Sequence, residues 1–186
     1  SSSSAASDVY KRQQLGQGNQ ARREGDIQGA IEAYQAILFI TPVHSQARQN
    51  LSDIYQEQAE SYLASGDDTR GLEHLRLAME MTPEDQALKD RHQQIINEKK
   101  SALVNSWLDK ADRAIKRKRW DEASNMAEEA LKVDPQDLDL QTRVARIKDA
   151  PRLEKIKSYR LEGETAIQKG DYNKAIAALK TATLLA

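Results

Sequence analysis

Apolar residues recur along the chain at helical spacing, and four stretches with this pattern can be aligned with one another. Three of them end in a proline, at residues 25–42, 66–83 and 118–135, and a fourth occupies residues 170–186. Within each stretch the apolar positions fall on one face of a helix. The strict alternation that is typical of strands is absent. The pattern therefore predicts a nearly all-helical chain of about eight helices and no strand.

Each column of this alignment has a physical explanation. The first column suits the left-handed residue that ends a preceding helix, and it holds Gly25, Gly66, Lys118 and Gly170. An aspartate that can cap a new helix follows in three of the four cases, at Asp26, Asp67 and Asp171. Small residues five positions after the first column allow two helix backbones to approach closely: Ala30, Gly71, Ala123 and Ala175. The closing proline disfavours helical geometry in the residue before it. Each stretch is thus expected to be the second helix of a helix pair.

The segments upstream of these stretches carry two further columns. One is aromatic in three of its four members, which are Gln14, Tyr55, Trp107 and Tyr159. The other is small throughout and holds Gly18, Ala59, Ala111 and Gly163. The combined pattern resembles the tetratricopeptide repeat, an antiparallel helix pair of about 34 residues. The resemblance covers residues 9–186 and departs from the family where leucine is usual, at Gln17, Gln58, Lys110 and Glu162.

This resemblance implies an all-α solenoid of four helix pairs, a single repeat domain over residues 9–186. Its units are about 9–42, 43–83, 84–135 and 136–186, at offsets of 41, 52 and 52 residues. The excess over 34 is close to whole helical turns, so lengthened first helices keep their apolar face. No Gly or Pro interrupts residues 84–117, which predicts one helix whose halves pack on the preceding and the following helix. We expect Pro151 to kink or divide the matching helix 136–169, and the whole to form an elongated, staggered rod.

Composition narrows the range of functions. The 186 residues include 28 Lys+Arg and 29 Asp+Glu, a net charge of −1 that argues against a general nucleic-acid binder. No apolar run is long enough for direct membrane insertion. The absence of cysteine excludes disulfides and thiolate–metal sites, and the three histidines, His44, His74 and His92, match no metal-binding spacing. We therefore predict no enzyme activity, no cofactor and no metal.

The two ends of the chain differ in character. Residues 1–8 are rich in serine without apolar periodicity, which predicts a flexible linker or tag. The last helix ends on bare Leu184 and Leu185, although solenoids need polar terminal caps. We therefore expect that the natural chain continues or that this end meets a partner.

In tetratricopeptide proteins the first helices line a groove that holds a peptide, and the resemblance carries this groove over by column. The resulting candidate groove comprises Arg12, Leu15, Asn19, Arg22, Arg23, Asp53, Gln56, Glu60, Leu63, Asn105, Leu108, Asp112, Ile115, Lys116, Lys157, Arg160, Glu164 and Ile167. The family's carboxylate-clamp columns hold Leu15, Asn19, Glu57 and Asp109, so a chaperone-tail function is not expected. Trp107, Trp120 and Tyr159 are expected to pack between helices.

Two functions follow from these expectations. The first is a protein–protein interaction scaffold that binds another protein or peptide through the groove. The alternative is a structural spacer or oligomerisation arm of a larger protein, self-associating through Leu184 and Leu185 with Ile176 and Leu179. The resemblance is compatible with a bacterial regulatory or envelope protein, in the cytoplasm or the periplasm. The basic run at 116–120 is interpreted as a solvated turn, with an acidic or phosphate-bearing partner as the alternative.

Overall fold

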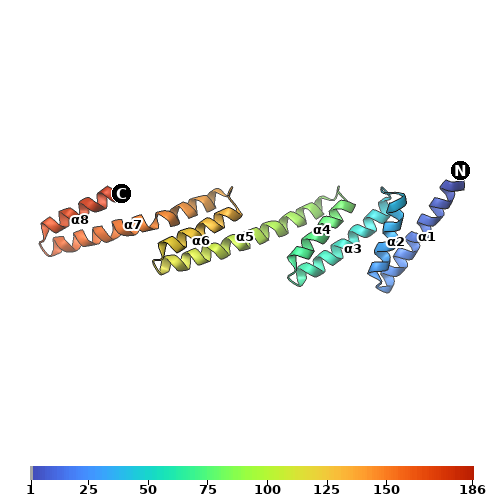
Figure 1. Cartoon of the computed structure of the whole chain (residues 1–186), viewed down its shortest axis with the longest axis horizontal. Coiled ribbons are helices and arrows are strands. Elements are labelled where there is room, and N and C mark those ends of the chain that lie inside the picture. The colour runs from blue at the N-terminus through green and yellow to red at the C-terminus, as the bar shows by residue number, and fades with distance from the viewer. Residues whose placement is uncertain (1) are drawn as a thin grey trace. The chain divides into compact units, whose positions relative to one another are not determined.

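The computed structural model describes residues 2–186 as eight α-helices, and this range contains no strand. The helices alternate between first and second members of four antiparallel pairs (Figure 1). Their bounds are α1 Ser2–Glu24, α2 Ile27–Ile40, α3 Ser45–Ala64, α4 Asp68–Met81, α5 Gln86–Lys116, α6 Trp120–Val133, α7 Leu138–Gln168 and α8 Tyr172–Leu185. The predicted all-helical fold of helix pairs is confirmed.

The turn inside each pair has the geometry that its sequence column predicts. Gly25, Gly66 and Gly170 take φ values of 81°, 82° and 74°, and Lys118 takes 56°. This left-handed conformation reverses the chain between the two helices of the pair. The aspartate that follows each of the three glycines accepts a hydrogen bond from a backbone N–H in the first turn of the second helix, at 2.9 to 3.2 Å. Arg119, which follows Lys118, makes no such side-chain cap.

The small-residue column marks the place where the two helices of a pair come closest. A Cβ atom added to Gly18 would lie 2.5 Å from Cε1 of Tyr34. A Cβ atom on Gly163 would lie 2.6 Å from Cγ of Leu179. Because real Cβ atoms do not approach carbon this closely, these positions admit no larger side chain without a shift of the opposite helix or side chain.

The chain divides into two compact units, unit 1 up to residue 97 and unit 2 from residue 98 to 186. The boundary falls inside α5, whose residues belong to different cores. Leu88 and Ile95 pack with Ala59, Leu75 and Ala78 of unit 1. The second half of α5 joins a core that spans α5, α6 and α7 and includes Leu108, Ala111, Ala123, Ala127, Leu140, Val144 and Ile147. The prediction that the two halves of this helix pack on the preceding and the following helices is therefore confirmed. This packing explains why the boundary between the two units falls inside α5.

Helix continuity agrees with the sequence in one place and differs in two. Helix α5 is a continuous helix of 31 residues, as predicted. Helix α7 also runs for 31 residues with Pro151 inside it, so the proline does not divide the helix. Helix α1 begins at Ser2, so residues 2–8 are helical where we expected a flexible linker; residue 1 lies outside the described part of the chain. Alanines and the 3.0 Å ion pair between Lys11 and Asp8 support this first segment.

A cation from the first helix reaches the C-terminal end of the second helix in every pair. Arg48 donates to the carbonyl oxygens of Met81 and Glu80 at 2.7 and 2.8 Å. Arg152 donates to the carbonyl oxygen of Leu185 at 2.7 Å. Lys100 forms a 3.2 Å ion pair with Asp134, and Lys11 donates to the Thr41 hydroxyl at 3.3 Å. Positive charge is favourable at a helix C-terminus, so this contact stabilises each pair from within.

Candidate functional site

Consecutive first helices are joined by one polar contact that recurs at equivalent positions. Asn50 on α3 donates to Asn19 on α1 at 3.2 Å, across 31 residues of sequence. Arg91 on α5 donates to Glu60 on α3 at 3.0 Å, and Arg143 on α7 donates to Asp112 on α5 at 2.9 Å, again across 31 residues each time. We call this contact the first-helix pair. It joins the middle or later part of one first helix to the beginning of the next.

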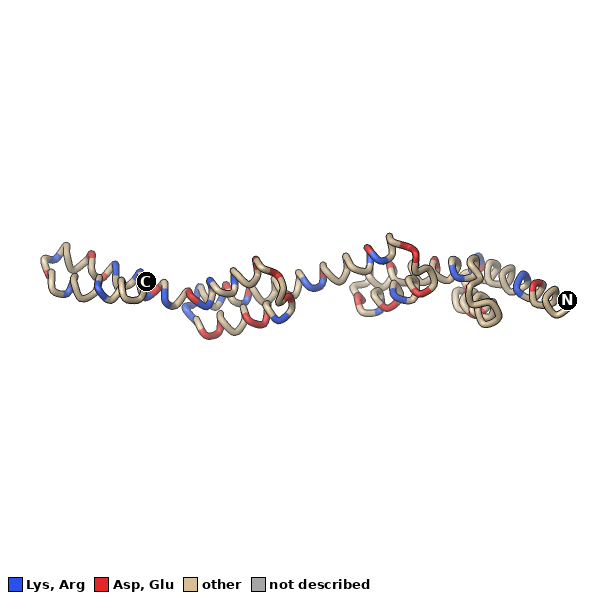
Figure 2. The backbone as a smooth tube through the Cα atoms, turned by 90° about the horizontal axis from the view of Figure 1, so that it is seen from above, with Lys and Arg blue, Asp and Glu red and all other residues tan. Residues whose placement is uncertain are grey.

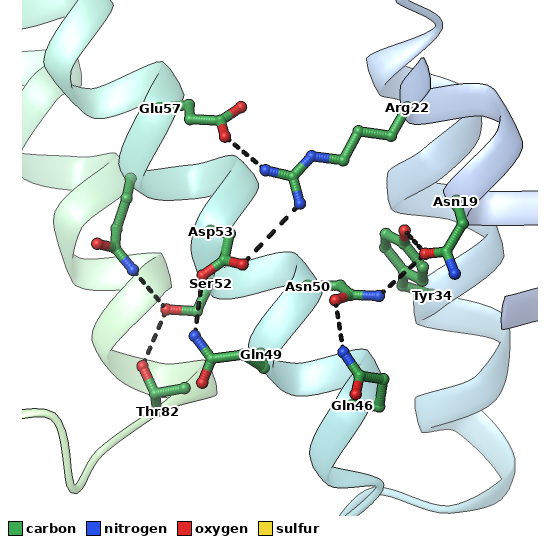
Figure 3. Close-up of polar contacts among 11 residues, drawn as sticks. Asn19, Arg22, Tyr34, Gln46, Gln49, Asn50, Ser52, Asp53, Glu57 and Thr82 are labelled. Carbon is green, nitrogen blue, oxygen red and sulfur yellow. Dashed lines mark hydrogen bonds and ion pairs between the residues drawn. The ribbon is translucent and has the colours of Figure 1, made fainter. Parts of the chain in front are cut away.

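In unit 1 the first-helix pair belongs to a larger polar network (Figure 3). The Tyr34 hydroxyl donates to Asn19 at 2.6 Å, and Gln46 donates to Asn50 at 2.9 Å. Arg22 completes the contact between α1 and α3, because it donates to Glu57 at 2.5 Å and lies 3.9 Å from Asp53. Burial raises the pKa of the Tyr34 phenol, which keeps this hydroxyl protonated as a donor.

A triad of mostly apolar residues accompanies the donor of each first-helix pair, and His92 is its one polar member. The triads are Ala47, Leu51 and Ile54 on α3, Leu88, His92 and Ile95 on α5, and Leu140, Val144 and Ile147 on α7. The first triad packs on the preceding second helix, in a core with Ile31, Tyr34 and Ile37 of α2. It covers Ile31, whose exposed fraction is only 9%. Each interior junction thus combines such a triad with the polar contact of the first-helix pair.

Most of the candidate groove lies within these junctions. Leu108 is only 4% exposed and belongs to the core of unit 2, so its assignment to a groove was wrong. Leu15 and Leu63 are half-buried and pack against cores of unit 1. The polar members Asn19, Arg22, Asp53, Glu60 and Asp112 make the contacts between first helices described above. Gln56 donates to Ser52, and Ile115 packs against the unit 2 core. These five polar residues, which stand in columns that face a ligand in the family, contact a neighbouring first helix in this chain.

The remaining candidate groove residues stay on the surface. Arg12 and Arg23 are exposed in unit 1, where they bond to the Asp8 carbonyl and to Gln20 on their own helix. The others are exposed in unit 2: Asn105, Lys116, Lys157, Arg160, Glu164 and Ile167.

The three aromatic residues that we expected to pack between helices are all half-buried. Trp107 lies against the unit 2 core, with the Lys110 ammonium 4.0 Å from its ring centroid, and Trp120 and Tyr159 are likewise partly covered.

The last helix pair presents these junction columns to solvent. Glu164 and Ile167 on α7 stand at the positions of Asn19 and Arg22, and Tyr172 and Ile176 on α8 stand at those of Ile27 and Ile31. Ile176 is 64% exposed and Tyr172 is 65% exposed, whereas Ile31 is covered. We call the surface formed by Glu164, Ile167, Tyr172 and Ile176 the end face. The sequence analysis placed Ile167 and Glu164 together in the candidate groove and Ile176 in a separate self-association surface, and it gave no signal that all three share one surface.

A hollow on α7 adjoins the end face. It has a volume of about 450 Å³ and is lined by Leu153, Ile156, Lys157, Arg160, Leu161 and Glu164. Ile156 stands in the column of Val104 and Arg160 in that of Leu108, and both of those residues pack into the core of unit 2. The hollow is therefore the place that a following first helix would fill.

The surface chemistry offers ion pairs rather than reactive groups. Basic and acidic residues are interspersed along the helices of each unit (Figure 2). Lys148 lowers the pKa of the Glu128 carboxyl, and Arg152 lowers that of Asp149, so both remain ionised partners of a cation. Within residues 2–186, no group of three or more His, Asp or Glu side chains is placed to hold a metal ion. None of the helices in this range combines the length and the apolar character needed to cross a membrane.

Comparison with known proteins adds one match to this picture. The sequence pattern of the tetratricopeptide repeat matches residues 156–186, which span the second half of α7 and all of α8. A solved structure described as the crystal structure of MamA protein is 13% identical, with a TM-score of 0.25, and covers 95% of this chain and 91% of that chain. A second, described as the crystal structure of MamA, is 16% identical with a TM-score of 0.24 and covers 90% and 93%. No curated protein matches the chain.

Proposed function

We propose that this tetratricopeptide-like helical repeat protein is a non-catalytic scaffold that binds another protein at the end face. Helix-pair repeats of this kind are typical of proteins that present an extended surface to a partner. The proposal keeps the scaffold function expected from the sequence. It moves the main binding surface from the first-helix groove to the last helix pair.

The observation that carries the proposal is the contrast between Ile31 and Ile176. They occupy the same repeat position, yet Ile31 is 9% exposed under α3 and Ile176 is 64% exposed. Ile167 and Tyr172 beside it are exposed as well, at 47% and 65%. Contiguous exposed apolar side chains rimmed by charge are typical of interaction sites. Three expected groove residues, Lys157, Arg160 and Glu164, also line the adjoining hollow and supply such a rim.

The alternative is a spacer or oligomerisation arm, in which a second copy of the chain takes the same end face. Leu184 on α8 is 79% exposed and adds to the apolar surface near the C-terminal end. A contact between the end face of one copy and a different surface of the next would be heterologous and would not stop at a dimer. Sedimentation of the purified chain separates the two functions, because only the spacer predicts concentration-dependent growth.

A comparative capture experiment tests the scaffold. The wild-type chain, Ile176→Glu and the control Leu138→Glu would be immobilised and exposed to an extract of the source cells. Leu138 is also exposed, at 73%, and lies in unit 2 at the start of α7, outside the end face. We expect a protein that is retained by wild type and by Leu138→Glu and lost with Ile176→Glu, and that binds again when purified. If every protein retained by the wild type is also retained by Ile176→Glu, and the wild type self-associates, the spacer is the better account.

A further inference from the structure

We propose that the occupant of the end face is an amphipathic helix of a partner protein with the pattern apolar-x-x-Arg-apolar-x-x-apolar, whose arginine pairs with Glu164. This inference rests on the scaffold function proposed above and names the chemistry of its partner. It follows from the way in which the chain fills the same columns at its own interior junctions.

The apolar part of the pattern comes from the triads. Helix α7 places Leu140, Val144 and Ile147 against the pair α5/α6, at spacings of four and three residues. Leu88, His92 and Ile95 on α5 have the same spacings, and Leu88 and Ile95 are buried against α3 and α4. Such spacings put three side chains on one helix face. A helix that fills the hollow next to Ile156 needs the same face.

The arginine comes from the first-helix pair. Where the earlier helix carries an acid, Glu60 or Asp112, the later helix carries Arg91 or Arg143, directly before the central residue of its triad. Where the earlier helix carries Asn19, the later one carries Asn50. The donor is thus a cation where the acceptor is an acid, and a neutral amide where the acceptor is a neutral amide. Glu164 is the acid of the last pair; it is exposed, and no ion pair reaches it within the described residues. A matching occupant supplies a cation there.

Charge complementarity also distinguishes this occupant from a second copy of the chain. If α1 of another copy took the place of a following first helix, it would present Ala6, Tyr10 and Gln13 in the triad columns. Val9 would stand in the arginine column and leave Glu164 without a cation. Glutamine in place of Ile54 or Ile95 would also leave part of the apolar surface uncovered. A partner helix with the full pattern would supply both the cation for Glu164 and the third apolar residue of the triad.

The probe for this inference is a synthetic peptide that copies residues 136–150 of the chain. It contains Leu140, Arg143, Val144 and Ile147 together with Asp137, which caps this helix by accepting from the Leu140 N–H at 3.0 Å. The chain's own α7 occupies the α5/α6 junction at the high effective concentration of a covalent link, so the free peptide is left with the end face. Binding would be followed by fluorescence anisotropy of the labelled peptide, and its folding by circular dichroism.

Charge exchange provides the decisive comparison. We expect the peptide to bind the wild type with a Kd below about 1 mM, and Glu164→Arg to weaken binding about tenfold. A peptide carrying Arg143→Glu should bind Glu164→Arg more tightly than the original peptide does. Asp109→Arg is the matched control, because Asp109 is an exposed acid of unit 2 outside the end face, and it should leave binding unchanged.

Three outcomes would overturn the inference. They are the absence of peptide binding at about 1 mM, equal binding to wild type and Glu164→Arg, and an equal loss with Asp109→Arg. Concentration-dependent self-association of the wild type that Glu164→Arg abolishes would instead assign the face to a second copy. The scaffold function is tested separately by capture with Ile176→Glu. If a captured partner no longer binds Ile176→Glu but binds Glu164→Arg as well as it binds the wild type, the scaffold function would stand. The proposal of an arginine-bearing helix would then be wrong.

Discussion

Arg143 on α7 donates a 2.9 Å hydrogen bond to Asp112 on α5, and it thereby repeats in unit 2 the contact of Arg91 with Glu60 in unit 1. The contact recurs although the repeats differ in length. Helix α3 has 20 residues, while α5 and α7 have 31 each. An extension of 11 residues is close to three helical turns, so both ends of the helix keep their facing positions. Lengthening the first helix therefore leaves the junction chemistry unchanged.

Two glycines on α1 give opposite predictions for the same substitution. Gly16→Ala should raise the free energy of unfolding by roughly 0.5–1 kcal/mol, because its added Cβ has no described heavy atom within 4 Å apart from its chain neighbours and its own helix backbone, and alanine is the better helix former. Gly18→Ala should lower it by about 1–3 kcal/mol, because the new Cβ meets the buried ring of Tyr34. Urea unfolding of both variants checks this, and equal effects would contradict the close approach of α1 and α2.

Lys118 is the one non-glycine residue with positive φ within residues 2–186, at 56°. Lys118→Gly should raise the free energy of unfolding by about 1 kcal/mol, because glycine adopts this conformation without strain. The exposed ion pair with Glu154 at 3.3 Å is lost, but such pairs contribute less than the strain relieved. Gly66→Ala, at φ 82°, is the reverse control and should destabilise. A stability that falls in both variants would show that the Lys118 turn is not strained.

The buried phenol of Tyr34 predicts a pH dependence. Burial raises its pKa above the usual value, so the folded state holds this proton at a pH where the unfolded chain releases it. The stability linked to Tyr34 is therefore fully present below the unfolded pKa of about 10 and is lost as the pH rises through the folded pKa. Tyr34→Phe should cost about 1 kcal/mol at neutral pH through the lost hydrogen bond to Asn19. Denaturation between pH 8 and about 11 should show a smaller alkaline loss in this variant than in wild type; parallel curves would contradict a buried phenol.

Trp107 is a packing residue by its position against the core of unit 2. From the sequence we expect Trp107→Ala to cost about 3–5 kcal/mol, as for a fully buried ring. Because the ring is half-buried and Lys110 covers one face, the structure favours the lower part of this range, about 3 kcal/mol. Thermal unfolding measures this, and a change of less than about 0.5 kcal/mol would show that the ring does not contribute to the core.

The sequence alone predicted the helix pairs because their determinants are local. Gly25, the Asp26 cap and the small Gly18 each act within one pair, and apolar spacing identifies the buried face. The junctions were harder to predict, because Glu60 and Asp112 look like ordinary solvated residues when their partners are unknown. A usable signal was present in Arg91 and Arg143, which share a column and lie 31 residues after those acids. The end face could not be predicted from spacing, because exposure depends on which column faces the next helix.

The most direct test of the central claim is site-specific photo-cross-linking at position 176. A benzophenone amino acid would replace Ile176 in one variant and Leu138 in the control, and each would be irradiated in an extract of the source cells. Both side chains are exposed in unit 2, at 64% and 73%, but only Ile176 belongs to the end face. The account predicts a covalent adduct with a different protein from position 176 and not from position 138. Adducts only with a second copy of the chain, or the same adducts from both positions, would contradict it.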